Sequence, residues 1–397
     1  MKWQAFHGAN LKCIIFNSFY GSAVEGQATV RYFMRMNYFD KDKTILSNQT
    51  APLPYVSLAD GEFGVGTTWE NSVAQVLPNT TSLDAATAIG WNIAEIKHAI
   101  TSGDRDISLL GLIQTAGKLT IADPTPTTPI EDNVGQGLLI SHYLELDGVI
   151  DLVGESQLLQ SEGSIVDADS GGYIERDQQG TANSFNYNYW TSSVGPEGDG
   201  NATLGTGVTA INADYTIDDV LNDGSNSDLY GSLNYGASPN AGGVIPPPGF
   251  IKTLSSYWLY KFNGPADNYD AWKKIDETSI LSSGEGYTMK GTSGTAPLSI
   301  PQNYVFKGLP NNGDISLSLT KNITASNPSG DDDRLIGNPY LSAIDAEQFI
   351  LDNMSVSDGG YNPTETVFNG ALYFWDHFGE QNSHILKSTW VVMPHVI

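Results

Sequence analysis

The sequence predicts an all-β protein, with a solenoid-like (parallel β-helix-like) N-terminal region, an antiparallel β-sandwich after it and one short helix. Three observations predict this class. Gly, Asn, Ser and Thr supply most of the polarity of the 397-residue chain, and only 16% of its residues are charged, which favours turns and strands over helical bundles. Aromatic residues reach 10%, with Tyr the most frequent. Short apolar runs recur between glycines and acidic turns.

The net charge and the cysteine content exclude some classes of protein. The chain carries 19 basic and 45 acidic residues, a formal charge of −26, so a polyanion would be repelled and nucleic acid is not an expected partner. Cys13 is the only cysteine, and no intrachain disulfide can form. No run of about 18 apolar residues occurs, and we expect no membrane-spanning helix.

Residues 1–50 form a first segment that matches nothing later in the chain. They contain a basic cluster around Arg31–Arg35. We expect an irregular leader here, with a small strand-rich piece as the alternative. The apolar run Leu11–Tyr20 lacks the basic start and the cleavage site of a secretion signal.

Residues 51–172 predict a β-solenoid. Runs such as Ile107–Ile113, Lys118–Asp123 and Gly137–Gly148 each place a few apolar residues and then break at Gly or Asp. Stacked coils of a parallel β-helix produce this pattern, because a single coil cannot bury its apolar edge alone. The repeat is irregular, and an ordinary β-sandwich is the alternative.

Residues 173–250 are predicted to form a junction and a loop-rich linker between two β architectures. In Tyr173–Gly195 the short apolar runs give way to strands rich in Trp and Tyr. Pro196–Gly249 lacks a clear pattern, and a long unpatterned stretch inside a folded chain is usually a linker or a functional loop.

Residues 251–397 predict the antiparallel β-sandwich. In Tyr257–Phe262 the residues Trp258, Tyr260 and Phe262 fall on one side of a strand, and the run Asp314–Thr320 alternates in the same way. One solvent-exposed face and one buried face are typical of antiparallel sheets packed on each other.

One helix is expected near residues 342–353. Ser342 can act as its N-cap, with Asp345 three residues later. Ala346, Phe349 and Ile350 would then share one face of the helix.

Five stretches of sequence between Trp69 and Lys387 are distinctive. They read IERDQQGTANSFNYNYWTSSVG, GEGYTMKG, NYVFKGLPNNGDI, LIGNPYLSAIDAEQFILDN and GALYFWDHFGEQNSHIL. These stretches resemble large secreted or cell-surface β-rich proteins of Bacteroidota, of the kind exported by the type IX secretion system. The resemblance implies an extracellular or cell-surface location, associated with the outer membrane. It implies no enzymatic mechanism.

The same resemblance predicts a frameshift near Lys387. After His-Ile-Leu the similar proteins continue in a Gly- and Tyr-containing pattern, whereas this chain reads Lys-Ser-Thr-Trp-Val-Val-Met-Pro-His from Lys387 to His395. A change of reading frame can restore that pattern. We therefore expect that the sandwich is truncated at its C-terminus and that a sorting signal is missing.

Four aromatic residues form the candidate ligand site. Trp258, Tyr260, Trp272 and Trp375 lie in the strand-rich C-terminal part and could form a platform on which sugar rings stack. Aromatic residues at strand spacing are more often part of a core, and this alternative stays open.

A structural calcium ion is the only cofactor that the sequence suggests. Glu197, Asp199 and Asn201 alternate oxygen-bearing side chains in a Gly-rich loop, as hard cations prefer. The same residue types are ordinary turn formers, so a plain turn is the alternative.

No catalytic residues are predicted. The chain lacks the Gly-x-Ser-x-Gly motif of many serine hydrolases. Glycoside hydrolysis would need two carboxylates across a groove, for which Glu175 with Asp177 and Asp147 with Asp151 are candidates. Carboxylates are abundant in so acidic a chain, and these pairs carry little weight.

The leading functional expectation is a non-enzymatic secreted or cell-surface protein with a structural or adhesive role, part of a larger exported protein. Surface glycans or other cell-surface proteins would be its partners. A carbohydrate-binding or carbohydrate-cleaving module is the alternative. Glycan binding that depends on Trp258 or Trp272 would favour this alternative.

Overall fold

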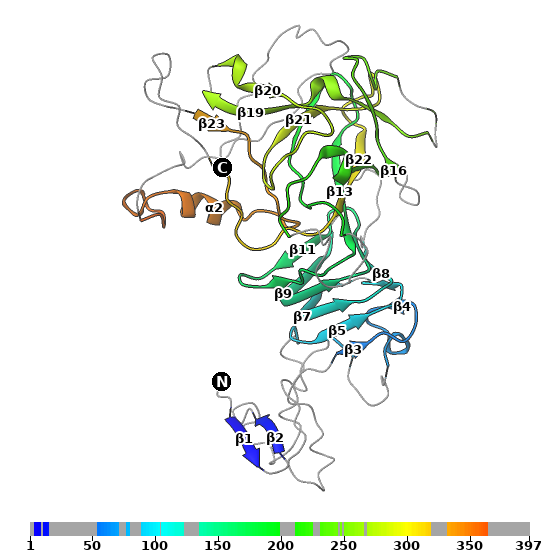
Figure 1. Ribbon diagram of the computed structural model, residues 1–397. Coiled ribbons are helices and arrows are strands. Elements are labelled where there is room, and N and C mark those ends of the chain that lie inside the picture. The colour runs from blue at the N-terminus through cyan, green and yellow to red at the C-terminus, as the bar shows by residue number, and fades with distance from the viewer. Residues whose placement is uncertain are drawn as a thin grey trace. The chain divides into compact units, whose positions relative to one another are not determined.

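A computed structural model of the chain (Figure 1) is built mainly of strands, and the predicted all-β class is confirmed. The structure describes residues 4–8, 11–15, 54–70, 77–79, 89–103, 105–122, 135–198, 211–224, 231–244, 247, 250–265, 268–318 and 332–363. The chain divides into two compact units. The first unit is Met1–Glu175 with Gly198–Ile211, and the second is Arg176–Glu197 with Asn212–Ile397.

The first unit contains two sheets whose paired strands run parallel. One sheet has the order β11 (Gln157–Gln160), β9 (Gly137–Leu146), β7 (Ile107–Gln114), β5 (Ile93–Ile96) and β3 (Tyr55–Val56), with β12 (Ile165–Val166) also paired to β9. The other includes β10 (Val149–Leu152), β8 (Lys118–Ile121), β6 (Ile100–Thr101) and β4 (Gly61–Glu62). An antiparallel pair, β1 (Gln4–Gly8) and β2 (Leu11–Ile15), comes before them in the chain.

Aliphatic side chains stack from strand to strand inside the first unit. From β3 to β10, successive strands belong alternately to the two sheets. Ala94, Leu112 and Leu144 lie in register on β5, β7 and β9 and are 0% exposed. Side chains alternate between the two faces of a strand, so every second residue of each strand must be apolar for its inward face to join these stacks. The burial of β5, β8 and β10 alternates in this way.

The second unit is built mainly of antiparallel strands. One sheet has the order β14 (Tyr187–Trp190), β21 (Tyr287–Lys290), β19 (Tyr260–Pro265) and β20 (Trp272–Lys274), with β23 (Asp332–Arg334) also paired to β19 (Figure 1). Another group has the order β16 (Gly231–Ser232), β15 (Leu221–Asp223), β22 (Pro301–Gly308) and β13 (Tyr173–Thr181), of which β13 begins in the first unit and continues in the second from Arg176. A parallel pair joins β17 (Asn234–Gly236) and β18 (Thr253–Ser255).

Aromatic side chains fill the core of the second unit. The ring of Trp190 meets that of Tyr304 edge-on, with 4.8 Å between centroids, and lies 5.5 Å from that of Phe306. Tyr287 and Met289 of β21 are 0% exposed. Ring pairs of this kind stabilise a core by roughly 0.5–1.5 kcal/mol beyond the burial of their area.

The helices are short, and the longest described one differs in detail from the expectation. They are η4 (Gly66–Thr68), α1 (Ile217–Val220), η6 (Ser256–Trp258), η7 (Tyr269–Ala271), α2 (Ala346–Asn353) and η8 (Val356–Asp358). The expected helix is α2, but Ser342 is not its N-cap. The carboxylate of Asp345 accepts from the amide of Gln348 (3.0 Å) and caps the helix instead, because a charged acceptor suits the positive end of a helix.

Two other stretches differ from the sequence prediction. Residues 314–318 form no strand, although their alternating pattern predicted one, and Leu319 lies outside the described residues. The stretch predicted as a loop-rich linker contains α1 and β15 to β17. Among the described residues, no helix has the length and apolar character needed to cross a membrane.

Candidate functional site

A row of four side chains crosses one sheet of the second unit. Tyr189 of β14 lies opposite Thr288 of β21, Thr288 lies opposite Tyr260 of β19, and Tyr260 lies opposite Lys274 of β20. Directly opposed residues of antiparallel strands project to the same face of a sheet. The four side chains therefore share one face.

Two further pairs extend this face. Tyr187 lies opposite Lys290, and Phe262 lies opposite Trp272. Each of these residues is two positions from a member of the first row, so its side chain projects to the same side. The rings of Phe262 and Trp272 meet at 4.9 Å.

Trp258 joins the same face from η6, just before β19. The ammonium group of Lys290 lies 3.9 Å from the centre of the Trp258 ring and 4.5 Å from that of Tyr187. The indole Nε1 of Trp258 donates to the carbonyl of Pro239 (2.9 Å), which fixes the ring. We define the aromatic face by six residues: Tyr187, Tyr189, Trp258, Tyr260, Phe262 and Trp272.

The aromatic face is the partly exposed side of a sheet whose other side is core. Tyr287 and Met289 of β21 project to the opposite side and are 0% exposed. On the aromatic face, Tyr189 is 43% exposed, and the other five residues are half-buried. Two exposed tyrosines, Tyr257 and Tyr269, add to the aromatic surface, and the ring of Tyr257 contacts that of Trp258 at 4.8 Å.

The charged and polar groups of this face have definite roles. Lys290 is only 4% exposed, and burial lowers its pKa to about 8. The hydroxyl of Thr288 donates to the carbonyl of Trp258 (3.0 Å). Burial, and after it the charges of the surrounding tyrosines, raises the pKa of Tyr187 above its usual range. Its phenol therefore stays protonated at neutral pH.

The structure brings together three of the four predicted ligand residues. Trp258, Tyr260 and Trp272 lie on the aromatic face, and Trp375 lies outside the described residues. Sequence reasoning missed Tyr187 and Tyr189. The Tyr-Asn-Tyr alternation at the start of β14 was the available signal, because residues two apart share a face of a strand.

The predicted calcium ligands are described only in part. The carboxylate of Glu197 forms an ion pair with the ammonium of Lys307 (2.7 Å), while Asp199 and Asn201 lie outside the described residues. In the part of the chain that the structure describes, no group of three or more His, Cys, Asp or Glu side chains is arranged to hold a metal ion. The calcium ion stays a prediction.

A lysine binds two of the carboxylates considered for glycan cleavage. In the first unit the ammonium of Lys118 lies 2.8 Å from the carboxylate of Asp151 and 3.0 Å from that of Glu175. Burial lowers the pKa of Lys118, but the hydrogen bonds and charges of these two carboxylates raise it on balance. In the second unit, the side-chain amide of Asn303 donates to Asp177 (2.9 Å).

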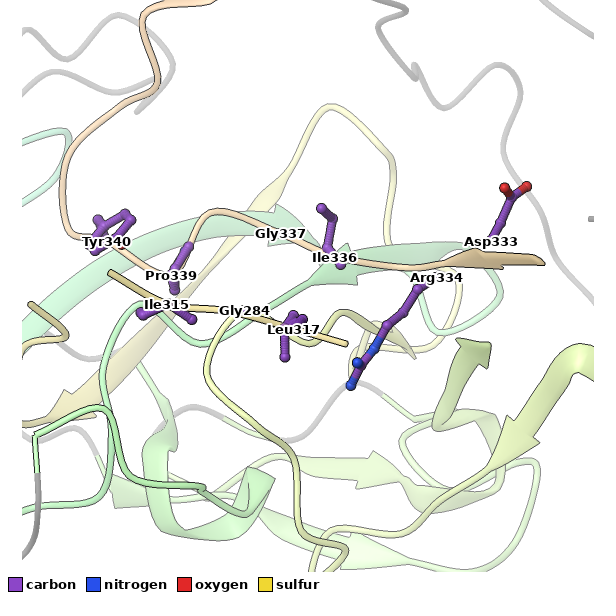
Figure 2. A pocket seen from close by; sticks show the side chains of 9 residues that line it. All are labelled: Gly284, Ile315, Leu317, Asp333, Arg334, Ile336, Gly337, Pro339 and Tyr340. Carbon is purple, nitrogen blue, oxygen red and sulfur yellow. The ribbon is translucent and has the colours of Figure 1, made fainter. Parts of the chain in front are cut away.

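A cavity of about 690 Å³ lies elsewhere in the second unit (Figure 2). Ile315, Leu317, Pro339 and Tyr340 form much of its apolar wall, and Figure 2 shows Asp333 and Arg334 at the end away from Tyr340.

The guanidinium at that end already has a partner. The guanidinium of Arg334 lies 2.9 Å from the carboxylate of Glu285, which is buried, and Lys261 lies 3.3 Å from its other oxygen. The main role of Arg334 is thus to neutralise a buried acid. We take the aromatic face as the candidate site.

Comparison with known proteins supports a family match over part of the chain. No curated protein and no solved structure matches it. Residues 237–391, a range that contains β18 to β23 and α2, match the model of a family described as a domain of unknown function (DUF8693).

Proposed function

We propose that this chain is a non-catalytic secreted or cell-surface adhesion protein that binds carbohydrate on the aromatic face of its second unit. The observation that carries the proposal is the set of aromatic rings on the partly exposed side of a sheet whose other side already forms a core. A core explains buried rings. It does not explain why Tyr189, Tyr257 and Tyr269 remain exposed.

The chemistry of the face suits sugars. One side of a pyranose ring presents mainly C–H groups, which pack on aromatic rings, while its hydroxyls need hydrogen-bond partners. The phenol groups of the tyrosines can both donate and accept such bonds. Few long aliphatic chains lie on this face, so it suits a polar ligand with flat apolar patches better than a lipid.

The architecture that we propose around this site has two parts. The first unit is a parallel β-solenoid, which the alternation of its strands between two parallel sheets supports. The second unit is an antiparallel β-sandwich, which the packing of Trp190 on Tyr304 and Phe306 supports. A solenoid and a binding module in one chain suit an adhesive role.

We further propose that the protein acts outside the cell or on its surface, as part of a larger exported protein. The resemblance to secreted proteins of Bacteroidota supports this location. The strongly acidic composition is consistent with it, because negative charge keeps an exposed β-rich surface soluble.

Pull-down with insoluble polysaccharides tests the proposed function. The chain should be retained by at least one of cellulose, chitin and starch granules, and Trp272→Ala should weaken retention at least about ten-fold, or about 1.4 kcal/mol. Tyr361→Ala, which removes another exposed aromatic ring outside the aromatic face, is the control and should behave like the wild type. Equal retention of Trp272→Ala and the wild type, or no retention on any polysaccharide, would contradict the proposal.

Sugar release separates binding from cleavage. If the retained chain liberates reducing sugar, and Glu175→Gln abolishes this release, the carbohydrate-cleaving alternative is correct. Retention without sugar release supports a binding module.

A further inference from the structure

The row Tyr189, Thr288, Tyr260 and Lys274 runs straight across four adjacent strands of the second unit. Neighbouring strands of a sheet lie about 4.8 Å apart, so the backbones of Tyr189 and Tyr260 are separated by about 10 Å, with β21 between them. The row therefore offers two aromatic rings at a separation set by the backbone of the sheet.

The residue between the two rings, Thr288, has a short side chain that is fixed by a hydrogen bond. Thr288 is 3% exposed, and its hydroxyl is bound to the carbonyl of Trp258. At this exposure Thr288 offers a ligand almost no surface, so contacts would come from the flanking rings of Tyr189 and Tyr260. The neighbouring row differs, because Lys290 lies between Tyr187 and Trp258 and is held there by both rings.

One end of the row is marked by a cation that hydrogen bonds hold in place. The ammonium of Lys274 lies 5.4 Å from the centre of the Tyr260 ring and donates to the backbone carbonyls of Ser256 and Ile275. Burial, the first cause, lowers its pKa from the usual value of 10.5. The lysine lies on edge strand β20, where the row ends.

The linkage of a polysaccharide decides whether it can follow such a row. In an extended β-1,4-linked chain, each pyranose is turned over relative to the last, so every second sugar presents the same face. The distance between such sugars is comparable with the span of two strand spacings. An α-1,4-linked chain coils and cannot lie flat on two rings of one sheet.

We propose that the aromatic face binds a linear β-1,4-linked polysaccharide that lies across the strands, with one sugar on Tyr189 and the next but one on Tyr260. This inference rests on the proposed function and specifies its ligand. The middle sugar spans the interval between the two rings. The smallest ligand that reaches both rings is therefore a trisaccharide, and affinity depends on chain length up to that size.

Isothermal titration calorimetry of the full chain with short sugars tests this inference. The probes are cellotetraose and chitotetraose, which are β-1,4-linked, maltotetraose, which is α-1,4-linked, and the disaccharides cellobiose and chitobiose. At least one β-1,4-linked tetrasaccharide should bind at least ten-fold tighter than its disaccharide and than maltotetraose. Tyr189→Ala and Tyr260→Ala should each reduce its affinity to that of the disaccharide, whereas Tyr361→Ala should not change it.

The outcomes separate this inference from the proposed function. Tightest binding of maltotetraose, or equal binding of disaccharide and tetrasaccharide, would overturn the inference while carbohydrate binding itself would stand. A loss caused by Trp272→Ala but by neither tyrosine variant would also overturn it. Thermal melting of each variant shows whether a loss of binding reflects a loss of fold, and Tyr189, at 43% exposure, is the variant least affected by that concern.

Discussion

The two units use their outward-facing strand positions differently. In the first unit, the outward positions of β9 carry mixed residue types (Leu139, Ser141, Tyr143 and Glu145), and aliphatic residues stack inside. In the second unit, β14 and β19 turn tyrosines outward although Trp190, Tyr287 and Tyr304 already fill the interior. The comparison shows that packing accounts for the pattern of the first unit, whereas the second unit has more aromatic residues than its core uses.

A large effect on stability is expected in the interior of the first unit. Leu112→Ala should lower the free energy of unfolding by about 2–5 kcal/mol, because it opens a cavity in the stack between Ala94 and Leu144. Denaturant titration measures the change. Leu110→Ala is the matched control, since Leu110 projects outward from the same strand; an equal loss in both variants would show that the two sides of β7 do not differ.

The next effect tests a charged contact of the first unit. Lys118→Met should lower the free energy of unfolding by on the order of 1 kcal/mol at pH 7, because it leaves Asp151 and the buried Glu175 without their cation. Lys118 is itself partly exposed, and solvent screening limits the loss. Lys97→Met removes a longer and more exposed pair with Glu95 (3.9 Å) and should change stability much less.

The sign of the pH dependence follows from the raised pKa of Lys118. A base whose pKa rises on folding stabilises the fold fully below its usual value of 10.5, and the contribution is lost as pH rises through the higher pKa of the folded state. The difference between wild type and Lys118→Met should therefore be constant from pH 7 to 9 and shrink above pH 10.5. A constant difference up to the alkaline limit of folding would rule out this role.

A smaller effect of opposite sign is expected for Glu145. Burial first, and then the charges of Asp147 and Asp167, raise the pKa of its carboxyl above 4.5. An acid with a raised pKa contributes stability below that value and loses it as pH rises. Glu145→Gln should thus stabilise the protein at pH 7, by roughly 0.5 kcal/mol or less because solvent screens the charges, and should match the wild type at pH 3. Glu162→Gln, at an exposed position, should change nothing at either pH.

The last comparison contrasts the two faces of a sheet in the second unit. Tyr189→Ala should change the free energy of unfolding by less than about 0.5–1 kcal/mol, because its ring is 43% exposed. Tyr287→Ala, on the opposite face of the paired strand, should cost about 3–5 kcal/mol. Similar losses in the two variants would show that the outward tyrosines serve the fold, and the contrast between the units would fail.

The local features of this architecture could be predicted from the sequence, whereas the pairing of segments far apart in the chain could not. Alternation along Tyr257–Phe262 correctly placed Tyr260 and Phe262 on one face, because the period of a strand is a local property, whereas Trp258 reaches that face from η6. The partners Tyr187 and Tyr189 come from about seventy residues earlier in the chain, and no local pattern specifies such a register. For the same reason Glu197 could be predicted as a ligand but not as the partner of Lys307.

Helix α2 shows a different limit of prediction from sequence. Its existence followed from the apolar spacing of Phe349 and Ile350, but Ser342 and Asp345 are both good caps by residue type. The choice between them depends on where the chain before the helix goes. The carbonyl of Ser342 accepts from Asn338, and the helix starts later, at Ala346.

The edge strand β20 has a consequence for solubility. A sheet with exposed rings would readily recruit further strands at a free edge and grow into aggregates. On this side the sheet ends in three residues, of which Lys273 and Lys274 are both exposed. So short and so charged an edge is a poor template for a foreign strand, and it allows the protein to display aromatic rings at high local concentration without polymerising along this edge.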